Sequence, residues 1–205
     1  MDFKFEIADS RKIARTLVAF ANTDGGHLLV GVKDNGAVAG VRSDEEFFMA
    51  EGAARMYCRP EVPFEVRDWN VDGRRVLEII IPKSDQRPHY APDKDDRWMV
   101  YIRRGDQNLL ANSVLLKIWQ KKKSGRTILV KFTEKEKFLL QYLEQHESIT
   151  LSKFRRLAKV SRLRAEAILV NFIMLEIVDI VITERSTYYK LNERYSENLP
   201  SLDWM

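Results

Sequence analysis

The stretch Ala19-Phe20-Ala21-Asn22-Thr23-Asp24-Gly25-Gly26, which continues as His27-Leu28-Leu29-Val30-Gly31-Val32, contains a helix end, a turn and a strand. Before it, apolar residues recur at helical spacing from Ile13 to Ala21, and the Ser10 hydroxyl is placed to cap this helix. Gly25 or Gly26 can take the left-handed conformation that ends a helix. The apolar run after them predicts a strand, and the triplet 34–36, Asp-Asn-Gly, predicts a tight hairpin turn.

Further short elements extend this pattern along the first half of the chain. A strand is predicted at 37–41 and a helix at 44–58, and a turn at 71–73 separates two strand-like runs. The later strands expected are 64–69, 75–81 and 98–103. Hairpins and single helices, rather than a regular strand–helix–strand alternation, are typical of an α+β fold.

The second half of the chain is mostly helical in pattern. Thr133 and Glu136 form a capping-box pair, and Phe154 and Leu157 are expected to point inward from the next helix. The expected elements are a helix from Thr133, a helix at 151–158, a helix capped by Ser161, and strands at 177–183 and 187–191. Three helices followed by a hairpin is the order of a winged helix-turn-helix domain.

The change of pattern near residue 112 predicts two domains. The run from Gln120 to Arg126 contains four basic residues with Ser and Gly, which indicates an exposed segment. The expected parts are an N-terminal mixed α/β domain (1–112), a basic linker (113–131), a winged helix-turn-helix domain (132–195) and a tail (196–205).

Charge is distributed unevenly between these parts. The chain of 205 residues has a net charge of +4. Residues 1–112 hold 17 basic and 19 acidic side chains, a net charge of −2, whereas 117–164 holds 14 and 4, a net charge of +10. Such a local excess is the electrostatic pattern of a protein that binds a polyanion. Lysine-rich helical faces also occur on surfaces without such a partner.

A winged helix-turn-helix places the N-terminal residues of its third helix at base edges in the DNA major groove. We therefore expect Arg162 and Arg164 to read bases, and Arg185, at the hairpin tip, to reach the backbone or the minor groove. The residues expected to neutralise phosphates are Lys121, Lys122, Lys123, Arg155, Arg156 and Lys159. The alternative is that the domain binds another protein or dimerises.

These residues favour a DNA-binding transcriptional regulator that binds duplex DNA, without catalysis or a cofactor. One short recognition helix specifies little sequence by itself, so a homodimer on paired half-sites is expected. A protein-interaction adaptor is a further hypothesis. It predicts that replacing Arg162 and Arg164 by alanine leaves nucleic-acid affinity unchanged.

A resemblance to a known family rests on five segments. These are Phe3-Lys4, 19–26, 29–36, 38–41 and Tyr101-Ile102-Arg103-Arg104-Gly105. Together they resemble the Schlafen/Alba-2-type DNA-binding domain, over about residues 1–112. In bacteria such domains are often followed by a winged helix, and the resemblance implies a transcriptional regulator.

The residues that match the family motif have two readings, which are fold specification and ligand contact. They are Asn22, Thr23, Gly25, Gly26, Gly31, Tyr101, Arg103 and Gly105. Arg103 and Arg104 could hold phosphate, or they could pair with acids. The candidate acids are Asp2, Asp106 and Glu78.

Some members of the resembled family are metal-dependent RNA nucleases with the motif Glu-Ser-x-x-x-Glu-Phe-Lys and a later acid after a strand. Here Asp2-Phe3-Lys4 matches its end, Asp34 matches the later acid, and the first Glu would precede Met1. The alternative function is therefore a nuclease for RNA or single-stranded DNA, with Mg²⁺ or Mn²⁺ on Asp2 and Asp34. It needs a third acid, for which Asp24 and Glu78 are candidates.

The sequence gives little support for other classes of function. No run reaches 18 apolar residues, so no membrane span is expected, and the acidic N-terminus does not resemble a secretory signal. The single Cys58 and three distant histidines offer no zinc spacing. A phosphate loop would need Lys where Val32 stands. We expect a reduced, cytoplasmic protein.

Overall fold

The computed structural model describes residues 1–125 and 132–197, and it divides the chain into two compact units. The N-terminal unit is Met1–Ala111 and the C-terminal unit is Asn112–Met205. No helix within the described residues combines the length and the apolar character that crossing a bilayer requires.

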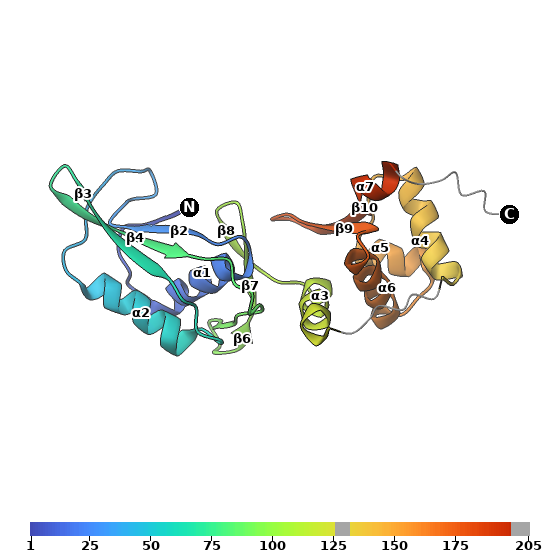
Figure 1. Cartoon of the computed structure of the whole chain (residues 1–205), viewed down its shortest axis with the longest axis horizontal. Coiled ribbons are helices and arrows are strands. Elements are labelled where there is room, and N and C mark those ends of the chain that lie inside the picture. The colour runs from blue at the N-terminus through green and yellow to red at the C-terminus, as the bar shows by residue number, and fades with distance from the viewer. Residues whose placement is uncertain (126–131, 198–205) are drawn as a thin grey trace. The chain divides into compact units, whose positions relative to one another are not determined.

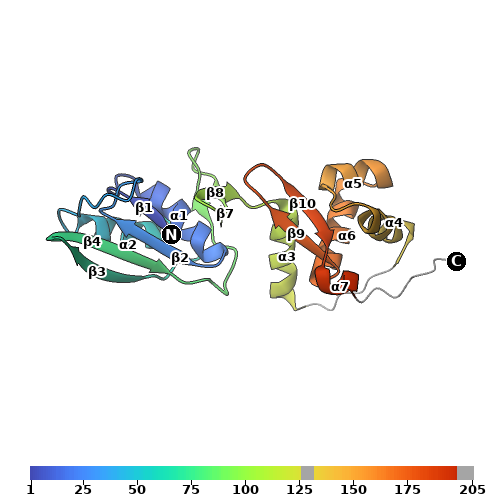
Figure 2. The same ribbon diagram turned by 90° about the horizontal axis from the view of Figure 1, so that it is seen from above.

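A four-stranded sheet forms the centre of the N-terminal unit. Its strand order is β1 (Asp2–Lys4), β2 (Gly26–Val30), β4 (Arg74–Ile81) and β3 (Glu65–Val71). The β1 and β2 strands are parallel, and the other neighbours are antiparallel. Helices α1 (Ser10–Asn22) and α2 (Glu45–Tyr57) cover one face of this sheet. Alternate residues of β2 and β4 pack into the core between the sheet and the helices. Figure 2 shows the same sheet and helices from above.

The ends of α1 explain how the motif stretch is placed. The helix is capped by the Asp9 carboxylate, which accepts hydrogen bonds from the backbone N–H of Arg11 (2.9 Å) and Lys12 (3.2 Å). The cap is therefore one residue before the Ser10 that the sequence indicated. At the other end, Gly25 has φ +75°, so the chain turns directly from α1 into β2 as predicted.

The strand predicted at 37–41 does not form. Val32 and Val38 make only an isolated antiparallel bridge. Gly36 (φ +84°) just before this segment and Gly40 (φ +82°) near its end turn the backbone out of extended geometry. Two small pairs complete the unit, namely β5 (Ala91–Pro92) with β6 (Trp98–Met99) and β7 (Tyr101–Arg104) with β8 (Gln107–Leu110).

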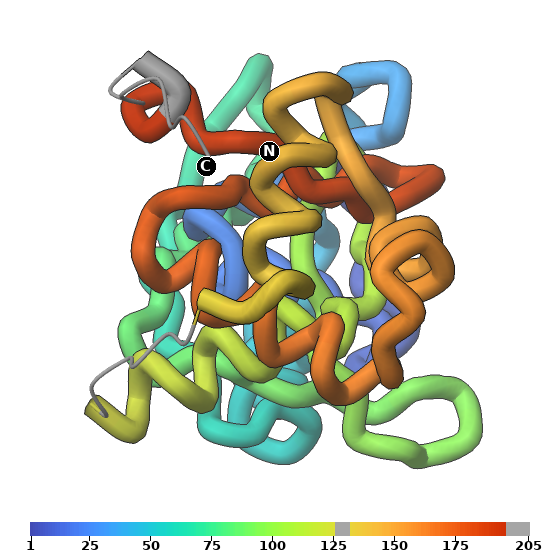
Figure 3. The backbone as a smooth tube through the Cα atoms, turned by 90° about the vertical axis from the view of Figure 1, so that its right-hand side faces the viewer, coloured from blue at the N-terminus to red at the C-terminus, as the bar shows by residue number. Residues whose placement is uncertain are grey.

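The described residues of the C-terminal unit form four helices, a hairpin and a short final helix. In order they are α3 (Ser113–Ser124), α4 (Glu134–Gln145), α5 (Leu151–Ala158), α6 (Arg162–Met174), β9 (Val178–Ile182), β10 (Thr187–Leu191) and α7 (Glu193–Glu197). Figure 3 follows this path in yellow to red. Its own core contains Leu139, Phe154 and Phe172.

The prediction of a linker over 113–131 is wrong for residues 113–124, which form α3. The Asn112 side chain caps the helix by accepting a hydrogen bond from Leu115 N–H (2.9 Å), and Val114, Ile118 and Trp119 are buried. Apolar residues four and five positions apart give this basic segment one face that packs into the core. The remaining linker residues 126–131, and the tail from 198 onward, lie outside the described residues.

Local helix signals in the C-terminal unit mostly agree with the structure. The capping box of Thr133 and Glu136 is present, and Ser161 caps α6. Phe154 is buried as predicted, but Leu157 is exposed on α5. The helix has only eight residues, and its buried face is restricted to Phe154 and Ala158.

Candidate nucleic-acid interface

Three of the predicted phosphate ligands form an exposed cluster at the end of α5. Arg155, Arg156 and Lys159, here called the α5 basic patch, are exposed, and no ion pair to them occurs within the described residues. Lys159 ends the helix in the left-handed conformation (φ 51°), and Val160 N–H then bonds to Arg155 C=O (3.1 Å). This tight turn leads directly to α6. Three unpaired cations beside a helix N-terminus can hold phosphate groups.

Arg162, a predicted base reader, is anchored to a buried carboxylate. Its Nε donates to Glu166 Oε1 at 2.8 Å, and its side chain is still 62% exposed. Glu166 also accepts hydrogen bonds from Ser113 Oγ (2.6 Å) and Lys117 Nζ (2.5 Å). The helix α3, expected as a linker, therefore supplies two of the three partners of this carboxylate.

The charge of Glu166 is maintained by these partners. Burial alone disfavours the carboxylate, but hydrogen bonds from Arg162, Lys117 and Ser113 outweigh burial and lower the pKa of Glu166 to about 2. Glu166 is therefore ionised at neutral pH. With two cations around one anion, the cluster keeps a net positive charge at the start of α6.

Arg164, the second predicted base reader, is anchored in a similar way. Its Nη2 donates to Glu136 Oε1 at 2.7 Å, and the Glu136 side chain is buried. Glu136 is also the capping-box residue of α4, so this pair links the start of α6 to the start of α4. A guanidinium carries several N–H donors, and one ion pair leaves the others available.

The remaining cationic candidates are spread over the C-terminal unit. Lys122 and Lys123 are exposed on the last turn of α3, whereas Lys121 Nζ donates to Asn171 Oδ1 of α6 at 2.5 Å. Arg185 is exposed in the turn between β9 and β10, where Thr183 Oγ1 accepts a hydrogen bond from Ser186 N–H (3.1 Å). The structure thus places Arg185 at the hairpin tip, as predicted.

The motif residue Asn22 is used inside the N-terminal unit. It is 2% exposed, its Nδ2 donates to the carbonyls of His89 and Tyr101 (both 2.9 Å), and its Oδ1 accepts from His89 N–H (2.8 Å). One amide therefore joins the end of α1, the loop at 87–90 and strand β7. Each of these backbone groups would otherwise be buried without a partner.

His89 is held in the same network, and its burial was not visible in the sequence. Its Nδ1–H donates to Pro60 C=O (2.8 Å), and Nε2 accepts from Ser84 Oγ (2.6 Å). Burial lowers the pKa of His89, while the bond to Pro60 opposes that shift. His89 is therefore neutral and positions its loop.

The other motif residues also support the fold. Thr23 Oγ1 accepts a hydrogen bond from Arg103 N–H (2.8 Å) and donates to Ala19 C=O (2.8 Å).

The glycines of the motif are closely packed. A Cβ at Gly25 would lie 2.6 Å from Ile81 C=O, and one at Gly26 would lie 2.3 Å from the Phe20 ring. Gly31 and Gly105 have positive φ, and Tyr101 is buried. All these contacts lie within the unit.

Arg103 is directed into the domain, which favours its pairing with an acid over the expected contact with nucleic acid. It is 8% exposed, and its guanidinium donates to Asn108 Oδ1 (2.9 Å) and Gly105 C=O (3.2 Å). Its Nη2 lies 3.3 Å from Asp2 Oδ1, which is the alternative pairing that the sequence left open. Arg104, the next residue, is partly exposed.

The residues of the alternative nuclease site lie in different segments of the N-terminal unit. Asp2, on β1, pairs with Arg103 and with Lys4 Nζ (3.2 Å). Asp34 is exposed in the turn that follows β2. Across the described parts of the chain, no three His, Cys, Asp or Glu side chains form a group that could hold a metal ion. The nearest charges to Asp2 are thus cationic side chains.

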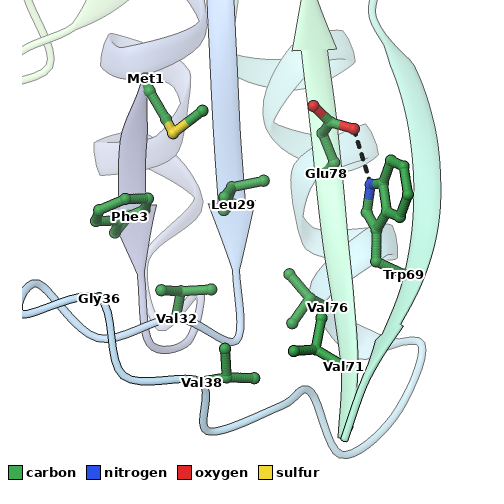
Figure 4. Close-up of a pocket in the computed structure, with 10 residues that line it drawn as sticks. All are labelled: Met1, Phe3, Leu29, Val32, Gly36, Val38, Trp69, Val71, Val76 and Glu78. Carbon is green, nitrogen blue, oxygen red and sulfur yellow. Dashed lines mark hydrogen bonds between the residues drawn. The ribbon is translucent and has the colours of Figure 1, made fainter.

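The sheet face opposite α1 and α2 carries an apolar pocket of about 360 Å³ (Figure 4). Its lining includes Phe3, Leu29 and Trp69, with Glu78 at the rim. Trp69 Nε1 donates to Glu78 Oε2 (2.8 Å), and His27 Nδ1 lies 2.7 Å from Glu78 Oε1. The bonds from His27 and Trp69 lower the pKa of Glu78. Side chains alternate along β2, β3 and β4, which explains why His27, Trp69 and Glu78 lie on one face of the sheet. The pairing register that brings these three residues together was not readable from the sequence.

Three of the solved structures that are similar to this chain are the following. The DIP2311 protein of Corynebacterium diphtheriae has a TM-score of 0.46 and 24% identity, over 65% of this chain and 30% of that one. The N-terminal domain of a RecG-related ATP-dependent DNA helicase-type protein of Nitrosomonas europaea has a TM-score of 0.35 and 21% identity, over 55% and 84%. The adhesin competence repressor AdcR of Streptococcus pyogenes has a TM-score of 0.30 and 17% identity, over 40% and 59%.

The chain spans about 30% of the length of the first of these solved proteins. No curated protein matches the sequence. The family model described as Schlafen, AlbA_2 matches residues 1–112, the part that contains the buried motif network of Asn22 and Thr23. Because this match covers more than half of the 205 residues, the protein belongs to the Schlafen, AlbA_2 family.

Proposed function

We propose that the protein is a transcriptional regulator that binds duplex DNA through its C-terminal unit, which we interpret as a winged helix-turn-helix. The order α4, α5, α6, β9 and β10 supports this interpretation. The observation that carries the proposal is the α5 basic patch, whose three cations are exposed and have no acidic partner within the described residues. Family membership supports a role in nucleic-acid binding.

In this mechanism the α5 basic patch, Lys122 and Lys123 neutralise phosphates, and Arg185 reaches the DNA backbone from the hairpin.

Arg162 and Arg164 face the major groove from the first turn of α6. Glu166 and Glu136 hold the two guanidinium groups in fixed orientations before DNA arrives. Fixed donors lose less conformational entropy on binding than free side chains do. The proposal assigns no catalytic step to the chain, and it places a homodimer on paired half-sites.

The test is fluorescence anisotropy with a labelled random-sequence duplex across a salt series. Replacing Arg155, Arg156 and Lys159 together by alanine should reduce affinity by about 10²-fold at low salt and lower the slope of log K against log salt by about three. A matched control replaces Lys12, Arg42 and Lys94, three exposed cations of the N-terminal unit, and changes the net charge equally. Equal losses in both variants would contradict the proposal.

A second arm separates this function from the nuclease alternative. The same protein is incubated with an RNA of equal length, with and without Mn²⁺. Regulator function predicts intact RNA in both samples. RNA cleavage that requires Mn²⁺ and is lost in Asp2→Asn would favour the N-terminal carboxylates instead.

A further inference from the structure

An apolar stripe runs along the outer face of α2. Phe48 is 63% exposed and Met56 is 67% exposed, with Gly52 between them at the same helical spacing. We call these three residues the α2 stripe. Two large exposed apolar side chains on one short helix are unusual for a surface without a partner. The stripe borders a groove of about 610 Å³, to which Met49 and Tyr57 also contribute.

Gly52 leaves an open position in the middle of this stripe. A Cβ built at Gly52 would meet no other atom within 4 Å. Nothing within the unit therefore requires glycine at this position, although glycine disfavours a helix by about 1 kcal/mol relative to alanine. The open position instead allows the backbone of a second helix to approach α2 closely between Phe48 and Met56.

The stripe is symmetric about Gly52 along the sequence. Phe48 precedes Gly52 by four residues and Met56 follows it by four. If two copies of α2 cross antiparallel on a two-fold axis at Gly52, Phe48 of each copy packs against Met56 of the other. This self-complementarity is what a closed two-fold interface requires.

Charges at the two ends of α2 favour the same antiparallel arrangement. Glu45 and Glu46 begin the helix, whereas Arg55 lies in its last turn and Arg59 follows it. Arg59 is exposed, with its guanidinium 3.9 Å from the centre of the Trp98 ring. Two-fold symmetry about Gly52 brings the end of one helix that begins with Glu45 beside the end of the other that carries Arg55 and is followed by Arg59. The antiparallel pair also brings opposite ends of the two helix dipoles together.

From these observations we infer that the outer face of α2 binds a second copy of the same chain. The interface is isologous, with the α2 stripe at its centre and Glu45–Arg59 pairs at its two edges. The inference takes from the proposed function only that two copies act together, and it can be tested without DNA.

The first experiment measures molar mass by light scattering after gel filtration, at about 100 µM, where dimers of micromolar affinity form. The full chain should have twice the 24.0 kDa of one copy. Phe48→Glu and Met56→Glu should each weaken self-association by at least 100-fold and give a single copy. The control Leu163→Glu changes an equally exposed apolar residue of the C-terminal unit and should remain dimeric. A monomeric wild-type chain, or dimeric Phe48→Glu and Met56→Glu variants, would overturn the inference.

A charge exchange tests the orientation of the two helices. Glu45→Arg and Arg59→Glu should each weaken the dimer by about tenfold, and the double variant should recover it, since the pair is restored in reverse. Failure of the double variant to recover any affinity, with its circular dichroism unchanged, rules out the antiparallel pairing. Unchanged DNA affinity of Phe48→Glu on a single half-site would leave the proposed function intact, whatever the result for the dimer.

Discussion

The family-motif residues of the N-terminal unit and the α5 basic patch of the C-terminal unit differ in where their polar groups are directed. In the N-terminal unit, Asn22, Thr23 and Arg103 turn inward and bond to backbone groups or to Asp2. In the C-terminal unit, Arg155 and Arg156 stay on the surface without partners among the described residues. The motif residues join chain segments within their own unit, whereas the α5 basic patch leaves its cations available to a ligand.

This difference separates two kinds of sequence signal. A motif of amides, hydroxyls and glycines can be specific to a family because it fixes a backbone path, as the network around Asn22 does. A cluster of cations has no such internal purpose, because charges without partners gain little from folding. In this chain the family motif therefore explains the fold, and the charge cluster indicates the candidate function.

The largest expected effect concerns the buried amide. Asn22→Leu should destabilise the N-terminal unit by about 4 kcal/mol, because three backbone groups of His89 and Tyr101 lose their partner while remaining buried. Urea denaturation followed by tryptophan fluorescence measures this. Asn35→Leu is the control, since Asn35 is exposed and accepts one bond from Ala37 N–H. Duplex affinity of the folded variant should be unchanged, and a strong loss would mean that the first unit also binds DNA.

A pair of glycine substitutions tests whether close packing or backbone conformation sets the motif. Gly25→Ala should cost about 3 kcal/mol, because its Cβ would meet Ile81 C=O and the residue has positive φ. Gly36→Ala shares the positive φ (+84°) but has open space, so it should cost about 1 kcal/mol. Thermal unfolding compares the two. Equal costs would show that conformation alone requires glycine at position 25.

The third prediction concerns acid stability of the C-terminal unit. The pKa of Glu166 falls from its usual 4.5 to about 2 in the folded chain. A lowered folded pKa gives stability that is complete above about pH 4.5 and is lost as the pH falls toward 2. Glu166→Gln should therefore be less stable than wild type at pH 7 by about 2–3 kcal/mol, with the difference vanishing near pH 2.

The control for this prediction is Glu184→Gln, which changes an exposed glutamate near the hairpin tip. Its stability should follow the wild-type curve across the whole pH range. Denaturant titrations at several pH values provide the measurement. A constant difference between wild type and Glu166→Gln from pH 7 to pH 2 would show that the cluster around Glu166 does not depend on its charge.

The smallest expected effect concerns Leu163, which is 72% exposed on the first turn of α6. In the proposed DNA complex its side chain meets the bases, where apolar residues contact the thymine methyl group. Leu163→Ser should reduce affinity for a selected A·T-containing site by about fivefold, a loss of about 1 kcal/mol, without changing stability. Leu175→Ser, at the opposite end of α6, should leave affinity unchanged. Anisotropy titrations on that site compare the two variants.

Several features followed from the sequence because their causes are local. The end of α1 and the turn into β2 depend on Gly25, and the start of α4 depends on the capping box of Thr133 and Glu136. Periodicity also indicated the main helices. The family resemblance over 1–112 was readable too, because the motif residues lie in a few short segments of the sequence, and the family match confirms it.

Other features depend on contacts between residues far apart in the chain. The sequence could not show that Arg103 is buried against Asp2, because 101 positions separate them. It also could not show that the basic helix α3 packs against α6. The strand expected at 37–41 fails because Gly40 turns the chain against β4. Charge content and local caps are properties of the sequence by itself, whereas the partner of each charge is decided by tertiary packing, since ion pairing depends on distance in space.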